Sequence, residues 1–175
     1  VGDDNFFGGF GDDTVEAGGG DDNVIGGFGD DSLSGGTGDD TVVGSDGNDT
    51  LDGGVSAGPG DQGDDLLSGL AGNDSIFGTE GADTLLGGAG DDILNSVDLL
   101  GEDEAGDILR GGTGQDTLIG DNGDILRGDG DIDEFELTLA NTGLTAPDLS
   151  IIADLNVVDE QVDITIDGGL AADGA

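Results

Sequence analysis

The chain has 175 residues, of which 42 are acidic and two are basic, and its formal net charge is -40. It contains forty glycines and no His, Cys, Met, Trp or Tyr. Such a charge opposes compaction, and glycine adds a large loss of backbone entropy on folding. Arg110 and Arg127 alone cannot hold nucleic acid or an anionic membrane surface, and no stretch is apolar enough to span a membrane. Cations are the partners that remain.

A nine-residue repeat runs through the chain, beginning with a partial copy at residues 1–7 (VGDDNFF). Nine complete copies start at Gly8, Ala17, Gly26, Gly35, Gly44, Gly69, Gly78, Gly87 and Gly111. Position 4 is always glycine, which permits the positive φ of a tight turn: Gly11, Gly20, Gly29, Gly38, Gly47, Gly72, Gly81, Gly90 and Gly114. Position 6 is always aspartate: Asp13, Asp22, Asp31, Asp40, Asp49, Asp74, Asp83, Asp92 and Asp116.

Position 8 is always apolar, and position 7 is mostly Thr, Ser or Asn. This pattern predicts a six-residue acidic turn followed by a three-residue strand whose position-8 side chain points inward. Two units then form one coil of 18 residues. The expected fold is an all-β stack of parallel strands with two rows of apolar side chains facing each other across a thin core.

Stacked coils would place like charges together. Neighbouring strands lie ~4.8 Å apart, so Asp22 is expected beside Asp40, and Asp31 beside Asp49. A column of carboxylates needs positive charge between its members. An oxygen-only site suits calcium, which takes six to eight ligands at ~2.3–2.6 Å, whereas magnesium demands tighter octahedral geometry and zinc prefers His or Cys. The sequence therefore predicts several Ca²⁺ ions.

The repeat is interrupted at residues 55–61 (VSAGPGD) and 96–104 (SVDLLGEDE), which are expected to be surface insertions. The copies that contain Asp107 and Asp124 are each one residue short, which leaves ligation by these two carboxylates open. Arg110 and Arg127 are expected to pair with neighbouring acids. Near the end of the repeats, Asp133 keeps position 6 and Phe135 keeps position 8.

Beyond the repeats, strands are expected at 135–139, 149–155 and 162–166. The predicted division is a roll over residues 1–136 and capping strands with a tail over 137–175. A cap is required because an uncovered coil exposes unpaired backbone and apolar surface. Phe6 and Phe135 are expected in the core, and Phe10 and Phe28 are expected to stack on the surface.

The motif resembles the RTX (repeats-in-toxin) nonapeptide G-G-x-G-x-D-x-U-x of hemolysin-type calcium-binding proteins, over residues 1 to about 136. This resemblance implies a calcium-loaded, right-handed parallel β-roll with a short C-terminal β cap. It implies that position-6 carboxylates and turn carbonyls hold the ions. The metal ligands it implies are Asp4, Asp13, Asp22, Asp31, Asp40, Asp49, Asp65, Asp74, Asp83, Asp92, Asp116 and Asp133, with Gly11, Gly20, Gly29, Gly38, Gly47, Gly72, Gly81 and Gly90. Position-5 acids (Asp12, Asp21, Asp30, Asp39, Asp64, Asp91) would offer mainly carbonyl oxygens and solvated side chains.

The resemblance also implies a module of a larger bacterial protein that is exported unfolded by type I secretion and folds on calcium outside the cell. The expected partners are calcium and the rest of the parent polypeptide, in a monomer that contacts neither nucleic acid nor the membrane interior. Intrinsic catalysis is not expected, because each candidate carboxylate recurs in every turn and no His, Lys or Cys completes a site.

Several alternatives stay open. The chain could be a calcium-dependent adhesin, an S-layer segment or an ice-binding segment, although Thr37, Thr79 and Thr113 are too scattered for a regular ice-binding array. It could be the C-terminal module of a secreted protease, lipase, epimerase or toxin. Plain acidic disorder would be indicated by circular dichroism that gains no strand signal with calcium.

Overall fold

The computed structural model describes residues 2–54, 63–97, 106–121, 123–140, 151–152 and 161–167. The described part of the chain consists of strands and turns, so the predicted all-β class is confirmed. The odd-numbered strands form one sheet: β1 (Asn5–Phe10), β3 (Asn23–Phe28), β5 (Thr41–Asp46), β7 (Leu66–Ala71), β9 (Thr84–Ala89), β11 (Ile108–Thr113), β13 (Ile125–Asp129) and β15 (Ile151–Ile152). The even-numbered strands form the other: β2 (Thr14–Gly19), β4 (Ser32–Thr37), β6 (Thr50–Asp52), β8 (Ser75–Phe77), β10 (Ile93–Asn95), β12 (Thr117–Gly120), β14 (Glu134–Ala140) and β16 (Gln161–Asp167).

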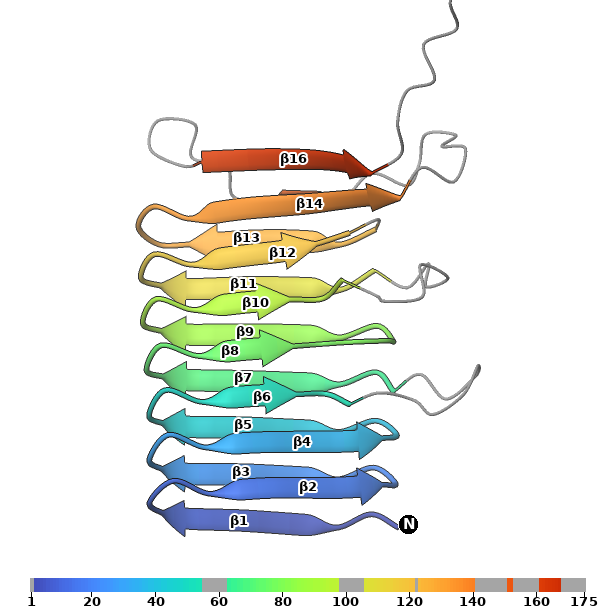
Figure 1. Ribbon diagram of the computed structural model, residues 1–175, viewed down its shortest axis with the longest axis vertical. Coiled ribbons are helices and arrows are strands. Elements are labelled where there is room, and N and C mark those ends of the chain that lie inside the picture. Colours follow the sequence, from blue (N-terminus) through green and yellow to red (C-terminus); the bar gives the residue numbers. More distant parts are fainter. Residues whose placement is uncertain are drawn as a thin grey trace, which may run out of the picture.

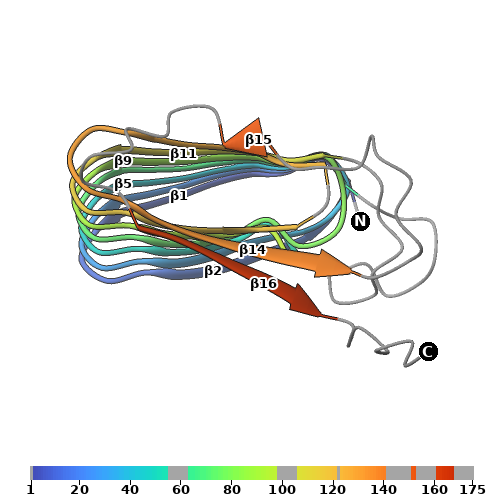
Figure 2. The same ribbon diagram turned by 90° about the horizontal axis from the view of Figure 1, so that it is seen from above.

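The strands rise as a stack in which each coil contributes one strand to each sheet (Figure 1). Seen along the stack, successive strands superimpose and the two sheets face each other (Figure 2). All pairings are parallel, and Val24 lies beside Val42, which confirms the 18-residue coil. The register survives both interruptions, since Val42 lies beside Leu67 and Leu85 beside Leu109. Because side chains alternate along a strand, this constant register keeps every position-8 residue inside.

The core is a double row of position-8 side chains. Fully or almost fully buried are Val24, Leu33, Val42, Leu51, Leu67, Ile76, Leu85, Leu94, Leu109, Leu118, Leu126 and Phe135. Phe6 and Val15 are only partly buried, because β1 and β2 have a neighbouring strand on one side only. Two buried side chains per coil are a small gain against the entropy of ordering a glycine-rich coil, so the roll needs a further source of stability.

The strands are longer than the sequence suggested. Strands such as β3 also include positions 1 to 3 of the next repeat, so the turn that follows comprises residues 29–31 alone. The six-residue turn is therefore wrong for these repeats, although β6, β8 and β10 have the predicted three residues. Position 4 has φ between 98° and 141° as predicted, and position 2 also has positive φ, as at Gly27 (123°). In β1 and β3 these position-2 glycines belong to the ladder, with Gly9 beside Gly27.

The roll has two different edges. At the regular edge an odd strand leads into an even strand, through short turns such as 29–31 (Figure 1, left). At the insertion edge an even strand leads into an odd strand, and both interruptions fall there, between β6 and β7 and between β10 and β11. The inserted residues 55–61 and 98–104 lie outside the described residues.

At the C-terminal end, β14 and β16 correspond to two expected strands, and Ile151–Ile152 is the described part of the third. β15 pairs with β13 and β16 pairs with β14, so both sheets continue in parallel register. The boundary at residue 136 stays a prediction, and β14 spans it. The tail at 168–175 lies outside the described residues.

Candidate metal sites along the two edges

Each position-6 aspartate lies directly before a strand and is held inside the edge of the roll. Nearly all are buried: Asp22, Asp31, Asp40, Asp49, Asp65, Asp74, Asp83, Asp92, Asp107, Asp116, Asp124 and Asp133 are at most 5 % exposed. Asp13 is half-buried and Asp4 is exposed, since they belong to the first coil. Burying this many carboxylates is costly unless hydrogen bonds or cations compensate.

One oxygen of each buried carboxylate is held by the backbone of the preceding coil. The N–H of Asp31 donates to Oδ1 of Asp49 over 2.8 Å. The same bond recurs along the regular edge from Asp13 to Asp133 and along the insertion edge from Asp4 to Asp124. These two aspartate ladders fix the orientation of the carboxylates. Each bond joins residues 17 to 25 positions apart, and sequence reasoning missed the ladders because their donors are main-chain N–H groups.

The other oxygen has no such partner in most turns. Oδ2 is buried and accepts no hydrogen bond from the described part of the chain in Asp13, Asp22, Asp31, Asp40, Asp49, Asp74, Asp92 and Asp116. A buried acceptor left without a donor is expensive, and more so when it is charged. A positive group beside each of these oxygens would compensate for the missing hydrogen-bond donor.

These oxygens point at a space beside the glycine at position 1. A Cβ built on Gly8 would lie 2.6 Å from Oδ2 of Asp13 and 2.7 Å from the carbonyl oxygen of Gly26. Gly26, Gly53, Gly69 and Gly87 show the same convergence of their own aspartate Oδ2 and the carbonyl of the next coil. No side chain fits beside these glycines, where a carboxylate oxygen and a carbonyl oxygen of the next coil lie close together. The donor set therefore fits a hard cation held between successive coils.

Among the described residues, no three His, Cys, Asp or Glu side chains gather at one point. A site without such a cluster would need backbone oxygens or water as further ligands, which suits calcium and not zinc.

The position-4 glycines, by contrast, pack coil against coil. A Cβ on Gly29 would lie 2.6 Å from the carbonyl oxygen of Gly11. This close approach explains why position 4 needs glycine for space as well as for φ. Ligation by the carbonyls of these glycines stays a prediction.

Burial raises the pKa of several of these aspartates above the ordinary value of 3.8: Asp40, Asp49, Asp65, Asp74, Asp92 and Asp116. Desolvation is the largest cause for Asp65, whose pKa rises to about 7; the hydrogen bond from Asp40 lowers it, and the charges of Asp40, Asp39 and Asp64 raise it further. Desolvation, followed by the charges of Asp74 and Asp116, also raises the pKa of Asp92 to about 7. At neutral pH these buried carboxylates are therefore unfavourable in their charged form unless they take up a proton or a cation binds beside them.

The position-5 acids are exposed, as expected, but they also hydrogen-bond between coils. Oδ1 of Asp12 accepts the N–H of Asp30 over 3.0 Å, and Oδ1 of Asp30 accepts the N–H of Asn48 over 2.8 Å. Their carboxylates thus stabilise the stack from outside.

The two arginines share one acid. Nη2 of Arg110 lies 2.6 Å from Oδ2 of Asp129, and Nε of Arg127 lies 2.5 Å from Oδ1. Burial acts to raise the pKa of Asp129, but hydrogen bonds from Arg110 and Arg127 bring the net pKa below its ordinary value. Pairing of both arginines is confirmed. The predicted surface stack is confirmed as well, with the rings of Phe10 and Phe28 5.1 Å apart and nearly parallel.

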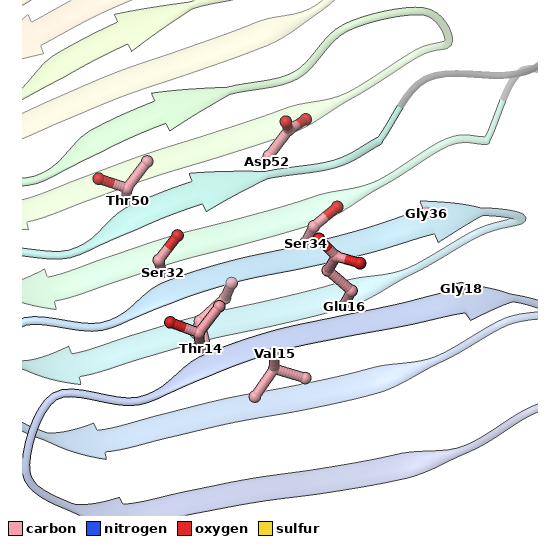
Figure 3. Close-up of a pocket in the computed structure, with 10 residues that line it drawn as sticks. Thr14, Val15, Glu16, Gly18, Ser32, Ser34, Gly36, Thr50 and Asp52 are labelled. Atoms are coloured by element: carbon pink, nitrogen blue, oxygen red, sulfur yellow. The ribbon is translucent and has the colours of Figure 1, made fainter.

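A shallow groove of about 410 Å³ lies on the outer face of β2, β4 and β6 (Figure 3). Thr14, Ser32 and Thr50 line one side of it, and Glu16, Ser34 and Asp52 form a second row. Glu16 and Asp52 are separated by the intervening strand β4. The groove is polar and open, and its carboxylates are not brought together.

None of the described segments forms a helix that is long and apolar enough to cross a membrane. A comparison with curated proteins finds no match. The sequence model of the RTX calcium-binding nonapeptide repeat matches four times, at residues 1–33, 25–56, 59–94 and 103–134. The stacked coils, the buried aspartates and these four matches agree: the chain belongs to the RTX calcium-binding nonapeptide repeat family, and its parallel β-roll binds several calcium ions.

Proposed function

We propose that the chain is a folding switch: it is disordered without calcium and forms the β-roll when calcium enters the gaps between coils. In each gap, Oδ2 of the position-6 aspartate and the position-1 carbonyl of the next coil are proposed as ligands. The observation that carries this proposal is the set of buried Oδ2 atoms without a hydrogen-bond donor, aimed at the same point as a neighbouring carbonyl.

The energetics support coupled binding and folding. The net charge of -40 repels itself, and the two-residue core of each coil is thin. Any ion that binds the folded chain alone stabilises it by mass action. Extracellular calcium modules bind at ~10⁻⁴–10⁻³ M, so the chain would remain unfolded at cytosolic calcium and fold outside the cell.

This switch suits a secreted bacterial protein, and the family is typical of such proteins. The chain is proposed to pass through a one-step export channel unfolded, and to serve as a monomeric, non-catalytic part of a larger polypeptide. Charge repulsion between copies favours the monomer. Any enzymatic, toxic or adhesive activity would belong to other parts of that polypeptide.

The test is far-UV circular dichroism of the purified chain during a calcium titration, with EDTA and magnesium as controls. Strand signal should be absent in EDTA, appear cooperatively at millimolar calcium, and not appear at equal magnesium. Equal strand content in EDTA and in calcium would contradict the proposal.

A further inference from the structure

We propose that the turn containing Asp124 binds no calcium and is closed instead by hydrogen bonds from the protein itself. The sequence left ligation at this turn open, because its repeat is one residue short. In the structure, the surroundings of this carboxylate differ from those in the complete repeats and do not fit a metal. The inference rests on the proposed function and takes one turn out of the set that binds calcium.

Both carboxylate oxygens of Asp124 accept hydrogen bonds, although the residue is fully buried. The N–H of Asp107 donates to Oδ1 over 2.9 Å, as in the other turns of the ladder. The N–H of Asp121 donates to Oδ2 over 2.6 Å, and Oγ of Ser96 donates to the same oxygen over 3.1 Å. Three donors on one carboxylate stabilise its charged form without a metal.

Asp40, in a complete repeat of the same edge, lacks this arrangement. Its Oδ1 accepts the N–H of Asp22 over 2.7 Å, but its Oδ2 is buried and accepts no hydrogen bond from the described part of the chain. A cation beside Oδ2 of Asp40 would therefore replace a missing donor. At Asp124, two donors already occupy the two lone-pair sites of Oδ2, so a cation would have to displace one of them.

The short repeat accounts for the hydrogen bond from Asp121. In a complete repeat four residues separate the first glycine from the aspartate, as between Gly35 and Asp40, whereas three residues separate Gly120 from Asp124. The N–H of Asp121 bonds to the side chain three positions later, so the bond closes the turn locally. The missing residue thus brings a main-chain donor to the oxygen that has none in the turn of Asp40.

Ser96 supplies the third donor from the neighbouring coil. The sequence assigned this residue to an insertion, but the structure places it in the stack, where its N–H donates to the carbonyl of Ile119 over 3.0 Å. Gly78 makes the equivalent 3.0 Å bond to Asn95 one coil earlier, and it has no side chain that could donate. The hydroxyl of Ser96 is therefore a feature of this turn that the preceding coil of the same edge does not have.

The Asp124 carboxylate also joins the two sides of the second interruption. Ser96 precedes that interruption and Asp107 follows it, and both donate to Asp124. Both donors and the carboxylate are buried, so these bonds are protected from competing water. The chain on either side of the interruption is therefore held in place at this turn by protein groups alone.

The proposal is tested by counting the calcium ions bound per full chain, by equilibrium dialysis at saturating calcium. Asp124→Asn should bind the same number of ions as the wild type. It should nevertheless unfold at a lower urea concentration in calcium, because the NH₂ group of Asn faces a donor and one hydrogen bond is lost. Asp40→Asn, on the same edge, is the matched control and should bind one ion fewer. Loss of an ion in Asp124→Asn would overturn the proposal.

Nuclear magnetic resonance of the calcium-loaded wild type decides the question even where Asp124→Asn does not fold. A scalar coupling across the hydrogen bond should connect the amide nitrogen of Asp121 with the carboxyl carbon of Asp124, and its absence would refute the metal-free turn. Circular dichroism separates this inference from the proposed function. If the wild type gains strand signal with calcium and the coupling is absent, the folding switch stands and only the inference fails. If the wild type gains no strand signal with calcium, the proposed function itself fails.

Discussion

Asp49 and Asp74 are 25 residues apart, yet the N–H of Asp49 donates a 2.8 Å hydrogen bond to Oδ1 of Asp74. Asp31 makes the same 2.8 Å bond to Asp49 over 18 residues. Asp49 therefore divides its two oxygens: Oδ1 holds the preceding coil, and Oδ2 is buried without a hydrogen-bond donor, where a cation is expected. Structural and metal-binding roles are thus joined in one side chain, and they can be separated by substitution.

Asp49→Asn separates these roles. The amide oxygen can still accept the N–H of Asp31, but the NH₂ group facing the gap cannot bind a cation. We expect the loss of one bound ion, a higher calcium midpoint of folding, and a loss of roughly 1.5–3 kcal/mol in stability measured by denaturation in calcium. The matched control is Asp30→Asn at the exposed position 5, which should change stability by less than about 0.5 kcal/mol. Equal effects of the two substitutions would contradict the assignment of Oδ2.

Acid should partly replace calcium. The folded-state pKa values of Asp65 and Asp92 are about 7, above the ordinary 3.8, so the folded chain binds protons more tightly than the unfolded chain. Their contribution to stability is fully present below pH ~4 and is lost as the pH rises through ~7. In EDTA, the strand signal in circular dichroism should therefore increase as the pH is lowered from 8 to 5. An unchanged signal over this range would argue against the burial of these carboxylates.

The same linkage predicts proton release on calcium binding. At pH 5.5, where acid favours the folded chain, an ion must displace protons from carboxyl groups such as those of Asp65 and Asp92, so the affinity of the folded chain for calcium should fall below its value at pH 7.5. The calcium concentration needed for folding should not rise, because the same protons stabilise the folded chain. Calorimetry in two buffers of different ionisation enthalpy would measure the released protons directly. Identical heats in both buffers would show that no protons are released.

Leu70→Gly should stabilise the calcium-bound roll. Leu70 has φ 76° and is 51 % exposed, so it carries left-handed strain and gains little from burial. The left-handed conformation costs roughly 1–2 kcal/mol for a residue with a side chain. Thermal denaturation in calcium should show a gain of about 1 kcal/mol. Leu66→Gly is the control: Leu66 lies in the same strand and is 41 % exposed, but it has no positive φ, so its replacement should destabilise the roll.

Asp129 should contribute to the stability of the roll chiefly through its negative charge. Arg110 and Arg127 lie side by side on β11 and β13, and Asp129 neutralises both. Asp129→Asn would leave two adjacent cations and should cost roughly 0.2–1 kcal/mol at low salt. The loss should largely disappear in 1 M NaCl, where charges are screened within ~3 Å. A loss that is independent of salt would indicate a steric and not an electrostatic role.

The fold could be predicted from the sequence wherever a residue type has a single structural role in the repeat. Aspartate at position 6, glycine at position 4 and the apolar residue at position 8 predicted the 18-residue coil, the core and the stacking of Phe10 on Phe28. Prediction failed where one residue type served several purposes. Gly8, Gly9 and Gly11 look alike in the sequence, yet the first leaves room, the second extends the strand, and the third makes the turn. The aspartate ladder was also missed, because its donors are main-chain N–H groups of another coil.

The confinement of both insertions to one edge bears on how such a protein can change in length. Hydrogen bonds of 2.7–2.9 Å join the aspartates of that edge whether they are 17, 18, 24 or 25 positions apart in the sequence. The pitch of the spiral is thus independent of the contour length between β6 and β7 or between β10 and β11. These two junctions are natural splice points: a foreign peptide or a whole domain grafted there would be displayed at a fixed height, while the opposite edge keeps its uninterrupted spacing.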